Sequence, residues 1–126
     1  LLLLCLPVAG ALMADDFGTP VTLEFSGQAI HARHSLMSYE IDMDDVVSIE
    51  LIDQLPQMTR TLGGAAETFL EGDFSSERYG TLKVCLDPEV GPWLLVRTGD
   101  GRTYLLGASD ATQTKAVLEE AGADQR

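Results

Sequence analysis

The sequence predicts a mainly β domain with one C-terminal α-helix, arranged as a small open barrel or a two-sheet roll. Three runs with strand character, 80–86, 93–98 and 102–107, follow one another, and a Gly99-Asp100-Gly101 turn joins the last two. We expect these runs to form a three-strand meander. A helical pattern comes next, with one narrow apolar stripe at Thr114, Val117, Leu118 and Ala121. A helix of this length is marginal alone, so the stripe predicts that it docks on the sheet.

The first half of the domain predicts three short strands, at 21–25, 29–32 and 36–41, and a longer one at 46–53. In the longer run, alternation puts three apolar side chains on one face: Val47, Ile49 and Leu51. With the last three runs, the expected total is six or seven strands.

Residues 54–79 show no strong periodicity. We expect partial strand pairing at 66–70 and a bulge or turn at Gly72. The two prolines within 87–92 predict a turn outside the sheet ladder.

Both ends of the expected helix carry signals. Asp110 suits the N-cap, and Gln113, three residues later, completes a capping-box pattern. Gly122 suits the C′ position just past the last turn.

The charge balance excludes several classes of partner. The chain has 126 residues, with 8 basic and 20 acidic side chains and a net charge of −12. Such a surface repels phosphate-rich partners and anionic lipid leaflets, so nucleic-acid binding is set aside. The two cysteines, Cys5 and Cys85, lie in an apolar leader and in a strand, which argues against a disulfide framework. Cys85 is expected to be a small buried apolar residue.

Residues 1–14 are uninterrupted apolar sequence. Two interpretations stay open: the last part of a truncated membrane-spanning helix, which is favoured, or the back half of a signal peptide with an Ala9-Gly10-Ala11 cleavage site. The domain proper is expected to cover 15–126 and to lie at a membrane, on a side that the sequence leaves open, or to be exported.

The histidines and the clustered aspartates do not form a convincing metal site. His31 and His34 are three residues apart and would point to opposite faces of a strand, so structural or surface histidines are favoured. Asp42, Asp44 and Asp45 lack the Gly and distal Glu of a calcium loop, so a turn with a solvated acidic face is favoured. We expect no metal and no cofactor.

Nucleophilic catalysis finds no support in the motifs. None of the serines sits in a Gly-x-Ser-x-Gly setting, and Gly63-Gly64 is not followed by the Lys of a phosphate loop. For Arg60, an internal ion pair with Glu67, Glu71 or Asp73 is favoured over ligand binding. We expect no enzymatic activity.

Several short segments occur in a distinctive order: Asp45–Leu51, Leu55-Pro56, Arg60–Gly63, Gly72–Phe74, Gly80–Val84, Val96–Gly101, Tyr104–Leu106 and Asp110–Thr114. Together they resemble the bacterial pleckstrin-homology-like (PH-like) domains, over about two-thirds of the chain. The resemblance implies a seven-strand open barrel of two near-orthogonal antiparallel sheets, capped by the C-terminal helix, often placed after membrane helices. Six positions of this pattern are expected to be structural: Pro56, Arg60, Gly63, Gly72, Phe74 and Gly80.

The resemblance does not extend to lipid recognition. Phosphoinositide-binding members of the wider superfamily use Lys and Arg around the loop between the first two strands. The corresponding loop here, Ser26-Gly27-Gln28, has no basic residue. We therefore do not expect phosphoinositide binding.

Two functions are compatible with these observations. The favoured one is a non-enzymatic, membrane-tethered interaction module whose sheet edge or barrel end binds protein, including another copy of itself. The alternative is an exported periplasmic or extracellular domain that binds a small ligand or resembles a hydrolase, which requires an apolar pocket with converging polar groups.

Overall fold

The computed structural model describes residues 20–34, 38–65 and 69–124. Within them the chain forms nine strands, one 3₁₀ turn and one C-terminal helix, which confirms the mainly β class but exceeds the expected six or seven strands. The leader 1–14, the start of the third expected strand at 36–37 and the expected pairing at 66–68 lie outside these residues. The elements are β1 (Thr22–Ser26), β2 (Ala29–Arg33), β3 (Ser38–Asp42), η1 (Met43–Asp45), β4 (Val46–Ile52), β5 (Met58–Ala65), β6 (Leu70–Ser76), β7 (Gly80–Leu86), β8 (Trp93–Thr98), β9 (Thr103–Gly107) and α2 (Ala111–Asp124).

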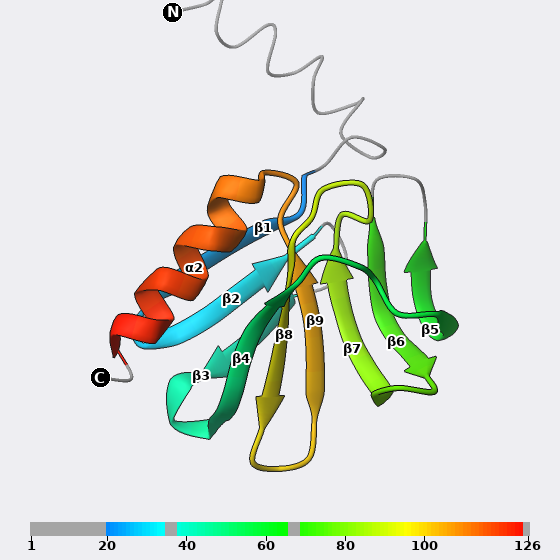
Figure 1. Ribbon diagram of the computed structural model, residues 1–126, viewed down its shortest axis with the longest axis horizontal. Helices are drawn as coiled ribbons and strands as arrows, with labels where there is room; N and C mark the ends of the chain where they lie inside the picture. The colour runs from blue at the N-terminus through cyan, green and yellow to red at the C-terminus, as the bar shows by residue number, and fades with distance from the viewer. Residues whose placement is uncertain (1–19, 35–37, 66–68, 125–126) are drawn as a thin grey trace, which may run out of the picture.

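The strands form two sheets. β1, β2 and β3 make an antiparallel meander, and the other six strands follow the order β4-β8-β9-β7-β6-β5. Figure 1 shows α2 next to β1 at one side of the molecule and β5 at the other.

The predicted meander of the last three strands is wrong. β9 lies between β8 and β7 and runs parallel to β7, while the other edge of β8 pairs with β4. The connection 87–92 carries the chain past β9 before β8 begins, and the Asp87 N–H donates to the Gly107 carbonyl at 3.0 Å. Side-chain alternation is the same whichever strand is the neighbour, so the sequence pattern could not reveal this order.

The stretch without periodicity contains a complete hairpin, β5 and β6. The register of β6 with β7 runs without interruption from Leu70 to Ser76, so Gly72 lies inside a strand, with φ 110°, and is neither a bulge nor a turn. The register shift lies on β5 instead, between Arg60 and Leu62.

Two hydrophobic cores lie on the two faces of the six-stranded sheet. The first fills the space between this sheet, the small sheet and α2, and includes Leu23, Ile30, Ile41, Leu94, Val96, Leu106, Val117 and Ala121. The second comprises Phe74, Leu82, Val84, Leu86, Trp93, Leu95 and Leu105.

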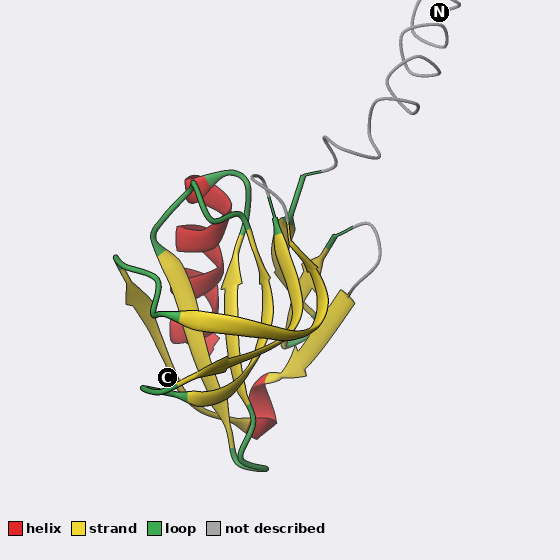
Figure 2. Ribbon diagram, turned by 90° about the vertical axis from the view of Figure 1, so that its right-hand side faces the viewer, coloured by secondary structure: helices red, strands yellow, loops and turns green. Residues whose placement is uncertain are grey.

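The six-stranded sheet curls around the second core. Ile52 at the end of β4 and Met58 at the start of β5 both pack on this core, although the two strands are opposite edges of the sheet. Figure 2, which looks from the β5 side, shows the bend of the strands. The alternation predicted for β7 is confirmed, because Leu82, Val84 and Leu86 belong to the second core and Cys85 to the first.

The helix docks as predicted but ends later. Thr114, Val117 and Ala121 are buried, and Leu118 is half-buried against the first core. Asp110 acts as the N-cap, since its side chain accepts from the Thr112 N–H at 2.8 Å. The helix continues to Asp124, so Gly122 lies inside it and the predicted C′ role is wrong.

β4 departs from its predicted faces. Val47 is 69% exposed and does not share the half-buried face of Ile49 and Leu51. The register with β8 shifts between Val46 and Ser48, which marks Val47 as the extra residue of a bulge.

Candidate functional site

The family-pattern positions gather at the β5 side of the six-stranded sheet. Arg60 lies opposite Phe74, and Gly63 opposite Gly72, across the β5–β6 pair. Phe74 belongs to the second core and Gly80, with φ 75°, opens β7. The structure therefore places all six positions on three neighbouring strands and the loop before them: Pro56, Arg60, Gly63, Gly72, Phe74 and Gly80.

Arg60 does not make the expected ion pair. Glu71 contacts His34 and Asp73 contacts Lys83, and Arg60 is exposed without an ion pair among the residues that the structure describes. The third expected partner, Glu67, lies outside them. The guanidinium of Arg60 therefore stands on the surface of β5.

β5 is an open edge of the sheet. It spans eight residues, pairs with β6 on one side, and stands last in the strand order of the described chain. Thr59, Arg60 and Thr61 are exposed, and Arg60 is the single charged residue in the strand.

The other edges are better protected against pairing with a foreign strand. β3 carries the acidic residues Glu40 and Asp42, and β4 carries Glu50 and a bulge at Val47. Charged side chains and bulges on an edge strand each discourage the addition of another strand. The start of β1 is covered by the approach to α2. There the Val21 N–H donates to Ser109 Oγ at 2.9 Å, and the Leu23 N–H to Gln113 Oε1 at 3.4 Å, so Gln113 bonds β1 and does not complete the predicted capping box.

The turn between β6 and β7 presents an aromatic ring beside two arginines. Ser76 and Gly80 pair across this turn, and Ser76 Oγ accepts from the N–H groups of Arg78 at 3.1 Å and Tyr79 at 3.2 Å. The positive φ of Gly80 fits the left-handed position that ends a three-residue hairpin loop.

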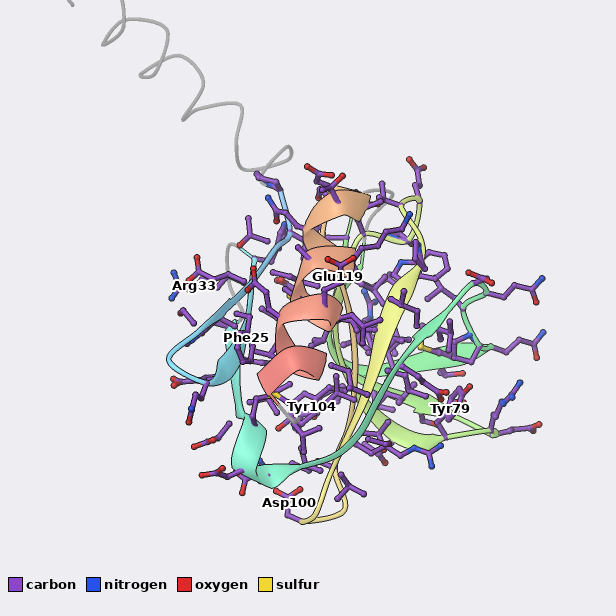
Figure 3. The ribbon with its side chains drawn as sticks, turned by 60° about the vertical axis from the view of Figure 1, so that its left-hand side comes forward. Phe25, Arg33, Tyr79, Asp100, Tyr104 and Glu119 are labelled. Carbon is purple, nitrogen blue, oxygen red and sulfur yellow. The ribbon has the colours of Figure 1, made fainter. Side chains whose placement is uncertain are left out.

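Two guanidinium groups lie over the Tyr79 ring. That of Arg78 is 5.3 Å from the ring centroid, and that of Arg97, from β8, is 5.8 Å away. Both distances are within the range of cation–π attraction. Figure 3 shows Tyr79 and Arg33 at opposite sides of the molecule. Local patterning missed this group, because Arg97 joins it from another strand.

A buried polar pair connects the two sheets. His34 Nδ1 lies 2.8 Å from Glu71 Oε2, and both side chains are only 3% exposed. The His34 ring stacks on Phe69 at 4.4 Å between centroids. His31 is separate, with Nε2 3.2 Å from the Ser26 carbonyl oxygen. The His34 side chain is thus buried and links the two sheets, whereas His31 is only partly buried, and the carboxylate partner of His34 was not anticipated.

Two further titratable side chains, Tyr39 and Cys85, lie near the His34–Glu71 pair. The Tyr39 hydroxyl donates to the Gly72 carbonyl at 3.4 Å, and burial, together with the Asp73 charge, raises the pKa of Tyr39 well above its usual value. Burial and the charge of Glu71 raise the pKa of the Cys85 thiol to about 12. Cys85 is fully buried and stays a neutral thiol, which agrees with its predicted role.

The described residues hold no group of three or more His, Cys, Asp or Glu side chains arranged to bind a metal. Asp42, Asp44 and Asp45 are exposed, and Asp42 Oδ1 accepts from the Asp44 N–H at 3.0 Å. This confirms the predicted acidic turn, which is η1.

Two hollows on the described surface are open to solvent. One of about 370 Å³ lies between β1, β2 and the start of α2, and is lined by Thr22, Leu23, Glu24, His31, Arg33 and Gln113. Another, of about 600 Å³, runs along β5 and β6 and is lined by Gln57, Met58, Thr59, Ser75 and Glu77. Neither has the apolar, enclosed lining typical of a small-molecule pocket.

Within the described ranges, no helix has the length and apolar character needed to cross a membrane. No protein-family model, curated protein or solved structure matches the chain.

Proposed function

We propose that the chain is a non-enzymatic interaction module that binds protein by strand addition at β5. The partner is another protein or a second copy of the chain. We also propose that the apolar segment 1–14 tethers the module to a membrane.

The proposal includes a PH-like scaffold, a variant of the seven-strand open barrel of two near-orthogonal sheets. The order of the sequence segments, the division into two sheets and the C-terminal helix support it. The parallel β7–β9 pair departs from the all-antiparallel sheets that the resemblance implies.

The nature of the β5 edge carries the binding proposal. Among the described strands β5 is the longest, it lies at an edge of the described sheet, and it has no acidic residue in a chain with 20 of them. Edge strands offer unpaired N–H and C=O groups to a partner strand, and natural proteins usually block them with charges or bulges. The bulge on β5 is present, but the charge protection is weak.

Photo-cross-linking in cells tests this proposal. A photoreactive amino acid at Thr59, in the full chain, is expected to yield a discrete adduct, whereas the same residue at Thr81, exposed on the interior strand β7, is not. An adduct of twice the chain mass identifies a second copy as the partner. Equal cross-linking from both positions, or none from Thr59, contradicts strand addition.

Mass spectrometry of the chain from cells tests the tether. An intact leader supports a membrane anchor. An N-terminus near Leu12 or Asp15 shows cleavage and favours the exported alternative instead.

A further inference from the structure

Within the described part of the chain, the two arginines beside Tyr79 have no carboxylate partner. Lys83 pairs with Asp73 at 3.0 Å and Arg102 lies 3.6 Å from Asp100, but among the described residues no ion pair forms at Arg78 or Arg97. This is unexpected in a chain where acidic side chains outnumber basic ones by 20 to 8.

The nearest acidic candidates do not neutralise the two arginines. Glu77 precedes Arg78 in the turn, and Glu50 lies on the same face of the sheet as Arg97, two residues along β4 from its pairing partner Ser48. Both glutamates are exposed, and neither lies within ion-pair distance of a described arginine.

Cation–π attraction favours keeping the two guanidinium groups beside the Tyr79 ring, and both arginines are exposed to solvent. A guanidinium presents five donors in a fixed plane, and that plane matches a carboxylate with two parallel hydrogen bonds. A restrained guanidinium loses less side-chain entropy when it binds.

We propose that the surface formed by Arg78, Tyr79 and Arg97 binds an acidic segment of a partner protein. This inference rests on the proposed function and names the chemistry of the partner. Arg78 lines a hollow of about 270 Å³ together with Pro56 and Gln57, which come just before β5, so the surface continues the proposed docking edge.

The net charge favours a short acidic segment over an extended anionic surface. A lipid leaflet or a nucleic acid approaches much of the domain and meets the −12 charge, whereas a short segment contacts the two arginines alone. Screening makes this distinction measurable, since the Debye length is about 8 Å at 0.15 M salt and about 30 Å at 0.01 M. Binding is therefore expected to strengthen from about 0.01 to about 0.15 M salt and to weaken again towards about 1 M.

Fluorescence anisotropy with the full chain tests the inference. The probe is a labelled peptide rich in Asp and Glu, and its control is the same peptide with Asn and Gln. The double change Arg78→Gln and Arg97→Gln is expected to weaken acidic-peptide binding at least about tenfold, and Arg97→Lys alone by less than Arg97→Gln. Arg33→Gln makes the same charge change as a single Arg97→Gln, at the opposite side of the molecule, and is expected to change affinity by less than about twofold.

Three results overturn the inference: equal binding of the neutral peptide, an equal loss with Arg33→Gln, or binding to phosphatidylserine vesicles that depends on Arg78 and Arg97. Unchanged urea unfolding midpoints ensure that each variant is folded. If the double variant binds no less peptide while Thr59 still cross-links, the inference fails and strand addition at β5 stands. If peptide binding is lost as expected but Thr59 gives no adduct, the acidic-segment site stands and the strand-addition proposal fails.

Discussion

The two edges of the six-stranded sheet differ in how they are protected. β4 carries Glu50, bulges at Val47 and is tied to the neighbouring hairpin, where the Gly99 N–H donates to the Asp45 carbonyl at 2.8 Å. β5 also has a register shift, between Arg60 and Leu62, but it is longer, has no acidic residue and ends one side of the described sheet. This contrast indicates that β4 is blocked against pairing with another strand, and we propose that β5 is kept available for binding.

The two edges also differ in how they attach to the rest of the fold. On the β4 side, Val46, Ile49 and Leu51 pack on the first core. On the β5 side, the link to the small sheet includes the buried contact of Glu71 with His34. Polar contacts of this kind are specific in geometry but costly to break.

The largest expected effect comes from removing the Glu71 carboxylate. Glu71→Ala removes this hydrogen-bond partner of His34 and truncates a buried side chain, and is expected to cost about 2–4 kcal/mol of unfolding free energy. Urea unfolding measures the cost, and hydrogen exchange should rise more on β5 and β6 than on β4. Glu50→Ala, at an exposed position on β4, is the matched control and should stay within about 0.5 kcal/mol. Equal losses from the two changes would show that the contact with His34 is not an anchor.

One glycine near each edge, Gly72 in β6 and Gly99 beside β4, allows the backbone conformations at the two edges to be compared. Gly72→Ala places a side chain at φ 110° in β6 and is expected to cost about 1–3 kcal/mol. Gly99→Ala, beside β4, meets only ordinary contact, with the Val47 Cγ2 atom 3.8 Å away, and should change stability by less than about 1 kcal/mol. Thermal unfolding of the two variants measures both losses of stability. If Gly72→Ala costs no more stability than Gly99→Ala, the strand geometry described for β6 is contradicted.

The binding role of β5 should be separable from its stability. Thr59→Glu adds the acidic residue that β5 lacks, and we expect cross-linking from a photoreactive residue at Gln57 to fall about tenfold, since charged edges resist strand addition. The unfolding free energy should change by less than about 0.5 kcal/mol, because Thr59 is exposed. Thr81→Glu, on the interior strand β7, serves as the control. If it lowers cross-linking equally, the effect is one of net charge.

The smallest expected effect concerns pH at the hairpin beside β4. A hydrogen bond from the Thr98 hydroxyl lowers the pKa of Asp100, helped by the Arg102 N–H. The ionised carboxylate is thus favoured in the fold. Its contribution is present above the ordinary Asp pKa and is lost as the pH falls through the lowered value. NMR titration should show the Asp100 pKa rising in Thr98→Val, and an unchanged pKa would rule out the hydroxyl as the main cause.

Local sequence patterns predicted those parts of the fold that depend on residues close together in the chain. The turn at Gly99–Gly101, the N-cap at Asp110 and the alternation of 80–86 are each set by residues close in sequence. The order of β7, β8 and β9 was missed, because alternation does not specify which strand lies alongside. β5 and the start of β6 were missed since Thr, Ser and Gly supply little apolar alternation.

The candidate surfaces depend on contacts that sequence spacing does not reveal. The bulge that exposes Val47 and the contact of His34 with Glu71, 37 residues apart, arise only when the sheets assemble. Arg60 was expected to form an internal ion pair, but Glu71 and Asp73 contact His34 and Lys83 instead, and the third expected partner, Glu67, lies outside the described residues.

Hydrogen exchange on the complex captured through Thr59 tests strand addition most directly, because a cross-link reports proximity and amide protection reports hydrogen bonds. The full chain would be compared alone and with its captured partner. We expect alternate amides of β5 to gain at least about tenfold protection while those of β4 keep their free-state rates. Protection gained on β4, or no change on β5, would contradict the proposed role of this edge.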